Sequence, residues 1–211
     1  MKKLAVPIAI VMFVVAFSLS SFGIASTDYG AYVGVFGGYT LSPDSSWKND
    51  NTGAEFDADV QEAWAVGMKF GYIPPQIKCV AFELEYFYSN PDIDRTIVGA
   101  SSFEGDIKFH SVLYNVMVRY PEGQFHPYLG GGIGFSYADA SIHATSPAGS
   151  ASTSENDTGF AWQILAGIDV DLANNWSADI GYRYFRTDPK LGNISVEYKT
   201  SMITLGIKYK F

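Results

Sequence analysis

The sequence predicts an all-β protein, an eight-stranded antiparallel up-and-down transmembrane β-barrel with four long outer loops and three short periplasmic turns. Three observations lead to this prediction. Residues 201–211 alternate apolar and polar side chains and end on the aromatic Phe211. Seven further segments of the chain alternate in the same way, and an apolar stretch near the N-terminus has the composition of an export signal. Because successive side chains of a strand point to opposite faces, each segment would have one bulky apolar face and one small or polar face.

The first expected strand, residues 29–41, has two faces that differ little. Val33 and Val35 lie on one face, whereas Tyr32 and Phe36 share the other face with glycines. The alternation alone therefore leaves open which face points outward. The other expected strands are clearer: residues 63–72, 79–88, 107–120, 125–137, 159–170, 176–185 and 197–211.

The second to fourth segments carry bulky residues on one face and small or polar residues on the other. In residues 63–72 the bulky face is Trp64, Val66, Met68, Phe70 and Tyr72. The opposite faces of the three segments carry Lys69, Glu83, Glu85, Ser111, Asn115 and Arg119. A strand of an outer-membrane barrel has this pattern, since one face meets lipid and the other faces the lumen.

The last four segments repeat the pattern. In residues 125–137, glycines alternate with Leu129, Ile133 and Phe135, and glycine permits the curvature that a small barrel needs.

The final strand resembles the C-terminal assembly signal of bacterial outer-membrane proteins, so we expect it to be recognised by the barrel-assembly machinery. The residues of that signal are Ile203, Leu205, Ile207, Tyr209 and Phe211.

The connections between the expected strands alternate in length. Residues 42–62, 89–106, 138–158 and 186–195 would form outer loops, and residues 73–78, 121–124 and 171–175 would form periplasmic turns. This asymmetry is typical of outer-membrane barrels. The third outer loop is rich in small polar residues and is expected to be mobile.

The N-terminus predicts export. Lys2 and Lys3 precede an apolar run, and the small residues Gly23 and Ala25 fit a cleavage site between Ala25 and Ser26. Residues 1–25 would then be a cleaved signal peptide and residues 26–211 one barrel domain. The alternative, a retained transmembrane helix, is disfavoured because the run is short and contains Pro7. The net charge of −8 argues against a nucleic-acid partner.

Charged residues on the small face separate a membrane barrel from a soluble barrel of the lipocalin type. A soluble barrel of this type encloses an apolar ligand cavity, and eight charged residues are poorly suited to line such a cavity. In a membrane barrel the same charges line the lumen, where balanced signs favour a neutralised salt-bridge network that plugs the bore over a narrow ion path. The eight residues are Lys69, Glu83, Glu85, Arg119, Asp169, Asp179, Arg183 and Lys208.

Catalytic and metal-binding patterns are weak. His110 and Ser111 are adjacent, but in a strand they point to opposite faces, unlike the His-x-Ser arrangement of the lipid A deacylase family. A lipid A-modifying enzyme therefore remains only an alternative. We expect no catalytic residue, no cofactor and no resident metal. Acidic residues in the first two outer loops either form a solvated surface, which is favoured, or bind divalent ions among lipopolysaccharide.

Three stretches resemble the opacity-like, porin-family outer-membrane β-barrel proteins: residues 126–135, with His126-Pro127-Tyr128 before a glycine-rich strand, residues 160–169 and residues 175–184. The resemblance implies the fold and the bacterial outer membrane, where lipid and lipopolysaccharide would surround the barrel. It does not imply one activity, because the family includes adhesins and surface antigens. We therefore expect a structural or surface-interaction role, with any extracellular ligand met by the outer loops.

Overall fold

The computed structural model describes residues 30–49, 55–59, 62–98, 101–146, 149–173, 175–191 and 194–211. The expected signal peptide and its cleavage site fall outside these residues. No helix among the described residues is long and apolar enough to cross a membrane.

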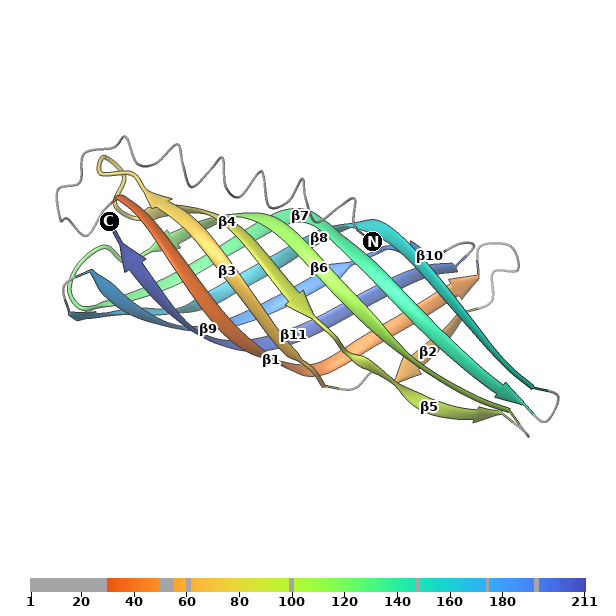
Figure 1. Ribbon diagram of the computed structural model, residues 1–211. Helices are drawn as coiled ribbons and strands as arrows, with labels where there is room; N and C mark the ends of the chain where they lie inside the picture. Colours follow the sequence, from red (N-terminus) through yellow and green to blue (C-terminus); the bar gives the residue numbers. More distant parts are fainter. Residues whose placement is uncertain are drawn as a thin grey trace.

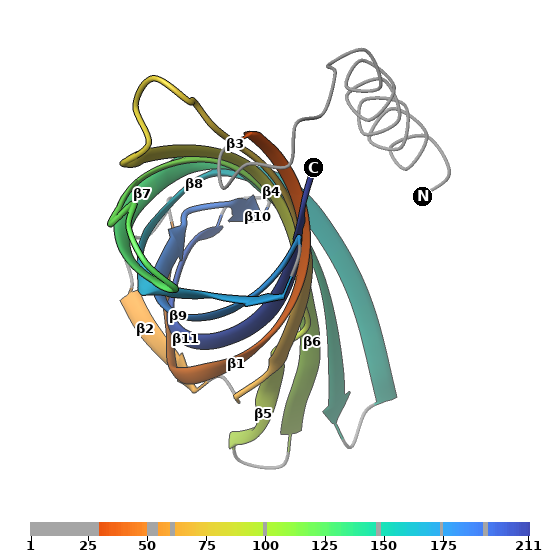
Figure 2. The same ribbon diagram turned by 90° about the vertical axis from the view of Figure 1, so that its left-hand side faces the viewer.

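One antiparallel sheet contains every strand of the described residues and closes on itself (Figures 1 and 2). Its strands are β1 (Gly30–Asn49), β2 (Glu55–Asp59), β3 (Trp64–Ile73), β4 (Val80–Ser89), β5 (Asp92–Val98), β6 (Ser101–Arg119), β7 (Phe125–Ser146), β8 (Gly149–Ala173), β9 (Trp176–Thr187), β10 (Lys190–Leu191) and β11 (Ile194–Lys210). The barrel wall has eight strands, in the order β1-β3-β4-β6-β7-β8-β9-β11, and β11 pairs with β1. The short strands β2, β5 and β10 pair onto β1, β6 and β11 at one end.

The closing seam joins the first and last strands of the wall. Val33 lies opposite Tyr209 and Tyr39 lies opposite Ile203, and the register shifts between Leu41 and Asp44. A closed sheet leaves no exposed edge in the wall, which satisfies the backbone groups of every strand within hydrocarbon. The predicted eight-stranded antiparallel barrel is therefore confirmed.

The predicted outer loops are wrong in extent. Strand β1 continues to Asn49, β6 begins at Ser101, and β7 and β8 form one hairpin that runs from Phe125 through Ser146 and from Gly149 to Ala173. These extensions are rich in serine, threonine and alanine, which carry no strong hydropathy alternation. They are strands because their backbones pair with the neighbouring strand; Ser102, for example, lies opposite Thr145.

The connections at the other end are short, as expected. The turn after β6 spans residues 120–124, and Gly123 has φ +79°, a conformation that side-chain-bearing residues rarely adopt. The C-terminus lies at this same end of the barrel (Figure 1).

Bulky side chains project outward along the whole wall. Trp64 is 73% exposed, Phe135 64% and Leu205 61%, whereas the inward Phe87 is fully buried. Val33 and Val35 are exposed while Tyr32 and Phe36 are buried, which settles the ambiguous faces of the first strand. This arrangement suits a lipid-facing surface and contradicts the soluble-barrel alternative.

Candidate functional site

The inside of the barrel holds all eight charged residues that alternation assigns to the small face. Each of them is buried, and they come from β3, β4, β6, β8, β9 and β11. Strand alternation places them inside, and closure of the sheet brings together residues that lie far apart in the chain. We call the charged cluster that results the lumen network; its members are Lys69, Glu83, Glu85, Asp169, Asp179, Arg183 and Lys208.

Lys208 is the centre of the lumen network. Its Nζ lies 2.8 Å from Asp169 Oδ2, 3.5 Å from Asp179 Oδ2 and 3.8 Å from Glu83 Oε1. Lys69 donates to the other oxygen of Asp179 at 2.9 Å. Two ammonium groups thus face three carboxylates, so that no member of this group is an isolated buried charge.

Two tyrosines complete this group of charges. Tyr32 donates to Glu83 at 2.6 Å, and Tyr128 donates to Asp179 at 2.9 Å. The Nζ of Lys208 lies 5.4 Å from the centre of the Tyr32 ring and 5.5 Å from that of Tyr128. Both rings therefore add cation–π contacts to the hydrogen bonds that they donate.

A second charged group lies around Arg183. Its guanidinium donates to both oxygens of Glu85, at 2.5 and 3.2 Å, which is the bidentate geometry of a strong ion pair. Gln163 donates to Glu85 and to Asn115, and Arg183 donates to Gln163. The guanidinium carbon also lies 4.6 Å from the centre of the Phe36 ring. The Glu85 carboxylate therefore accepts hydrogen bonds from side chains of two strands, β8 and β9.

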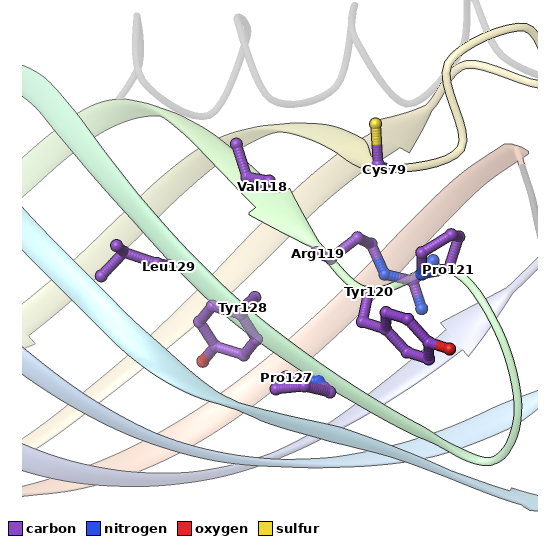
Figure 3. A pocket seen from close by; sticks show the side chains of 8 residues that line it. All are labelled: Cys79, Val118, Arg119, Tyr120, Pro121, Pro127, Tyr128 and Leu129. Carbon is purple, nitrogen blue, oxygen red and sulfur yellow. The ribbon is translucent and has the colours of Figure 1, made fainter.

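Arg119 does not join the lumen network, in contrast to the expectation. It is buried, yet none of its three guanidinium nitrogens has a hydrogen-bond partner within the described part of the chain. Arg119 is the last residue of β6, next to the short turn (Figure 3). Alternation predicts that its side chain points inward, but it does not predict which charges meet inside the barrel.

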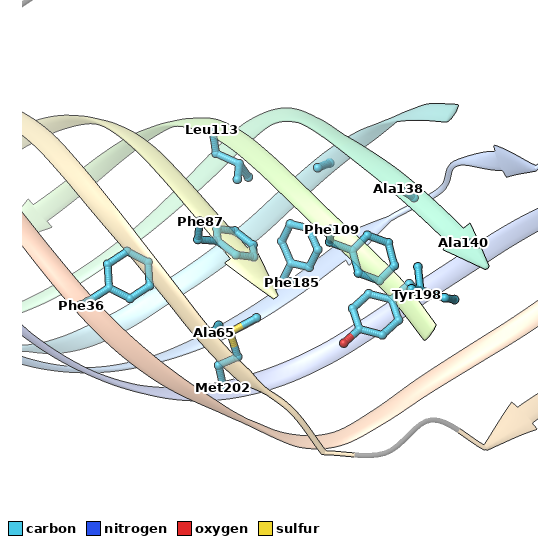
Figure 4. Close-up of a cluster of buried hydrophobic side chains, with 12 residues drawn as sticks. Phe36, Ala65, Phe87, Phe109, Leu113, Ala138, Ala140, Phe185, Tyr198 and Met202 are labelled. Carbon is cyan, nitrogen blue, oxygen red and sulfur yellow. The ribbon is translucent and has the colours of Figure 1, made fainter. Parts of the chain in front are cut away.

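An apolar layer also fills the inside, and sequence reasoning missed it (Figure 4). Phe87 meets Phe185 edge-on at 5.0 Å between ring centres, and Phe109 stacks on Tyr198 at 4.5 Å. These residues lie on the inward face of their strands, which otherwise carries small or polar residues. The sequence does indicate them, because β4, β6 and β9 carry large residues on both faces at these positions. The buried cluster is Phe36, Ala65, Phe87, Ile107, Phe109, Leu113, Ala138, Ala140, Ala161, Phe185, Tyr198 and Met202.

The histidines are held by structural contacts. His110 Nδ1 lies 2.9 Å from the Tyr86 hydroxyl on the outer face, while Ser111 points inward and bonds to Ser136. His126 contacts the Tyr120 carbonyl oxygen with Nδ1 and Asp171 with Nε2, at 2.9 and 3.1 Å. The side chain of His143 lies outside those that the structure describes.

Charged residues at the outer end are described only in part. Lys108, an exposed residue of β6, donates to Asp106, 3.0 Å away. Most acidic side chains of the first two outer loops fall outside the described set. Among the described residues, no three His, Cys, Asp or Glu side chains gather as a metal site would require.

The residues of the expected assembly signal lie on the outer surface of β11. Ile203, Leu205 and Ile207 are exposed along the strand, and the Tyr209 ring meets both Trp176 and Phe211 edge-on, at 5.0 and 5.4 Å. These three aromatic residues lie next to one another at the short-turn end of the barrel, where an aromatic girdle is expected.

Comparison with solved structures shows the same fold. The chain is 17% identical to Neisserial surface protein A, with a TM-score of 0.54 over 86% of this chain and 97% of that one. It is 21% identical to the outer membrane protein OprG of Pseudomonas aeruginosa, with a TM-score of 0.54 over 87% and 96% of the two chains.

Among curated proteins, an uncharacterised protein of Brucella abortus is 33% identical over 85 residues, or 37% of this chain. The match spans only 30% of that relative's length. The family model for the outer membrane protein beta-barrel domain matches residues 9–211. The chain therefore belongs to the outer membrane protein beta-barrel domain family, which places it in the bacterial outer membrane.

Proposed function

We propose that this protein is a plugged outer-membrane barrel that acts at the cell surface through the outer ends of its strands, as a structural or adhesin-like protein. The observation that carries the proposal is the filling of the lumen at two successive levels. The charged lumen network occupies one level and the apolar layer around Phe87, Phe109, Phe185 and Tyr198 occupies the next.

The filled lumen argues against a narrow pore. Eight strands enclose a bore that side chains can fill, and here ion pairs and aromatic contacts cross it. In planar bilayers we expect the purified protein to give no reproducible conductance steps. Steady steps of uniform size in independent preparations would instead establish a pore.

The outer end offers a surface for a partner. Residues 149–156 of β8 pair with β7 on one side, and the pairing of β8 with β9 begins only at Ala161. No described strand pairs with the other edge of residues 149–156. An unpaired strand edge can accept an extended segment of another protein through backbone hydrogen bonds.

A shortened hairpin tests the surface role. Replacing residues 139–156 by Asn-Gly joins Ala138 to Asp157, which lie opposite each other in the β7–β8 pairing, so the barrel wall should remain intact. We expect cells with this variant to lose binding to immobilised extracellular-matrix proteins or host cells. A Gly123→Asn variant, altered at the opposite end, is the matched control. Binding that survives the shortening would refute a role for this hairpin.

An enzyme acting on lipid A is the rival reading. It is disfavoured because His110 and Ser111 point to opposite faces and each already has another partner. Purified protein incubated with acyl-labelled lipopolysaccharide should release no labelled fatty acid. Release that disappears in a His110→Ala variant would make the protein an enzyme.

A further inference from the structure

The outer part of β8 has an edge with which no described strand pairs. The backbone N–H of Asp188 donates to the Phe160 carbonyl oxygen at 3.3 Å, and the next residue, Pro189, has no N–H with which to continue this pairing. Strand β10 lies near β8 but pairs with β11. Beyond Phe160, β8 continues to Gly149 and pairs with β7 alone. We call the unpaired side of residues 149–156 the free edge.

The backbone groups on the free edge follow from the pairing of β8. The Phe160 carbonyl oxygen faces β9, and the β7–β8 register runs from Val170 to Gly149 without a shift. The N–H and C=O of one strand residue point to the same side, and this side alternates along the strand. Every second residue therefore presents one donor and one acceptor to the free edge. These residues are Ser150, Ser152, Ser154 and Asn156.

The free edge lacks the features that protect the other strand edges at the outer end. Proteins block such edges with charged residues, bulges or very short strands. Strand β5 contains three charged residues and a register shift between Ile93 and Thr96, β2 contains three acidic residues, and β10 has two residues. Residues 149–156 contain one charged residue, Glu155, and no proline. The free edge is therefore open to pairing with another strand.

We propose that the free edge pairs with the same edge of a second copy of this protein. The inference rests on the proposed surface role and gives it a partner. Two identical edges pair about a two-fold axis, and the paired strands are then antiparallel. A strand of another protein could also use the free edge, but a second copy brings an edge that is equally long and equally unprotected.

The sequence of the free edge is compatible with pairing to itself. With the two-fold axis at Thr153, Ser152 lies opposite Ser154 of the second copy, and residue 150 lies opposite residue 156. Every donor and acceptor of the free edge is then paired. Glu155 lies opposite Ala151 of the second copy, so no like charges face each other.

The symmetry of the pair places the two copies in different membranes. The β7–β8 hairpin continues the barrel wall, so its sheet runs along the barrel axis (Figures 1 and 2). A two-fold axis perpendicular to this sheet reverses the direction of the barrel axis. Two barrels in one membrane point the same way, whereas barrels in two facing membranes point in opposite directions. The pair therefore joins two cells.

The free edge lies outside the hydrocarbon of the membrane. Phe160, which is 51% exposed, is the last bulky residue on the lipid-facing side of β8. Gly149 lies about 35 Å further along the strand, at roughly 3.3 Å per residue. Long O-antigen chains on both cells would hold two such edges apart. The test therefore uses host cells whose lipopolysaccharide lacks O-antigen.

Mixing labelled cells tests whether the partner is a second copy. Cells that express the protein carry one dye, and cells of the same host without the protein carry another. Because many weak pairs act together between two cells, we expect expressing cells to clump and to be enriched at least about tenfold over the other cells in the clumps.

Two charge variants test whether the free edge forms the contact. Ser152→Lys/Ser154→Lys places like charges opposite each other in the pair, and Ser152→Asp/Ser154→Asp does so with the other sign. Each variant alone should lose clumping, and a mixture of the two should recover it, because opposite charges across antiparallel strands attract. Ser102→Lys, on a strand that pairs on both sides, is the control and should clump as wild type does. All variants are compared at equal amounts of folded barrel, measured by the electrophoretic mobility of unheated samples.

Three results would overturn the proposal. Equal recruitment of cells without the protein would mean that the partner is another surface molecule. Clumping of either charge variant alone at the wild-type level would mean that the contact does not use the free edge. A mixture of the two variants that stays dispersed would mean that the two edges do not lie opposite each other. Cells that bind matrix proteins but do not clump would contradict this inference alone, whereas cells that do neither would also contradict the proposed surface role.

Discussion

Lys208 illustrates how single residues hold this barrel together. Its ammonium contacts carboxylates from β4, β8 and β9 while its backbone lies in β11, so one side chain links four strands across the lumen. The energetic value of such a contact lies less in the attraction than in the penalty of breaking it. Removing one partner leaves the other as an uncompensated buried charge.

The Arg183–Glu85 pair allows that penalty to be measured. Glu85→Leu should destabilise the barrel by about 3–5 kcal/mol, because it leaves the Arg183 guanidinium buried without its carboxylate. The double variant Glu85→Leu/Arg183→Met should recover most of the loss. Urea unfolding in lipid vesicles is the measurement.

Glu197→Gln is the matched control, since Glu197 pairs with Arg186 at a partly exposed position of the outer rim. Its cost should stay below about 1 kcal/mol. If the double variant were as unstable as Glu85→Leu alone, the loss would come from packing and not from an unpaired charge.

Glycines beside the lumen tyrosines provide a second residue-level prediction. A Cβ built on Gly71 would lie 2.1 Å from Cζ of Tyr32, the ring that donates to Glu83. Gly71→Ala should therefore cost about 1–3 kcal/mol through displacement of that ring. Gly37, whose Cβ would meet nothing within 4 Å, is the control for intrinsic propensity. Equal unfolding midpoints for the two alanine variants would show that the Tyr32 ring moves aside freely.

At the scale of elements, β11 is the strand that both closes the wall and carries the expected assembly signal. It pairs with β9 and with β1, so the sheet cannot close before β11 is in place. Its outward residues are exposed to lipid in the folded barrel. Removing one of them should therefore affect assembly more than stability.

Phe211→Ala tests whether an outward residue of the last strand affects assembly more than stability. We expect the amount of folded barrel in cells to fall several-fold, because the assembly machinery loses its recognition residue. Refolding of the purified chain into lipid vesicles should remain close to that of wild type. Ile133→Ala, at an outward position of β7 away from the terminus, is the control. A parallel loss in cells and in vesicles would mean that Phe211 contributes to stability and not to recognition.

At the scale of the whole molecule, the lumen is divided along its axis. Charged pairs and apolar rings occupy successive levels, and the two meet where Arg183 lies over the rings of Phe36 and Phe87, at 4.6 and 5.3 Å. A conducting path would have to pass both levels. Opening the barrel should therefore require changes in each of them.

A combined variant tests the plug. Phe87→Ala/Phe185→Ala removes the edge-on aromatic pair, and Arg183→Ala/Glu85→Ala removes the bidentate ion pair beside it. We expect the variant with all four substitutions to produce conductance steps in planar bilayers. Either pair of substitutions alone should produce none. Circular dichroism checks that the barrel still folds. Steps from the aromatic variant alone would mean that the charged level is already permeable.

The sequence by itself determined the architecture and the faces of every wall strand except the first. Alternation along β3, β4 and β9 is strong because one face must meet hydrocarbon, and that requirement acts on every strand separately. For the same reason the inward positions of Lys69, Glu83 and Lys208 could be assigned without any knowledge of their partners. The outer strand extensions were missed because backbone pairing, and not side-chain hydropathy, stabilises them.

Only the tertiary structure decided which charges meet. Lys208 Nζ and Glu83 Oε1 are 3.8 Å apart across the lumen, whereas Arg119, which alternation also turns inward, contacts no carboxylate among the described residues. The pairing depends on the stagger between strands and on the level of each residue along the barrel axis. Alternation predicts whether a side chain points inward or outward. It does not predict the register between strands, which is set only when strands far apart in the sequence pair.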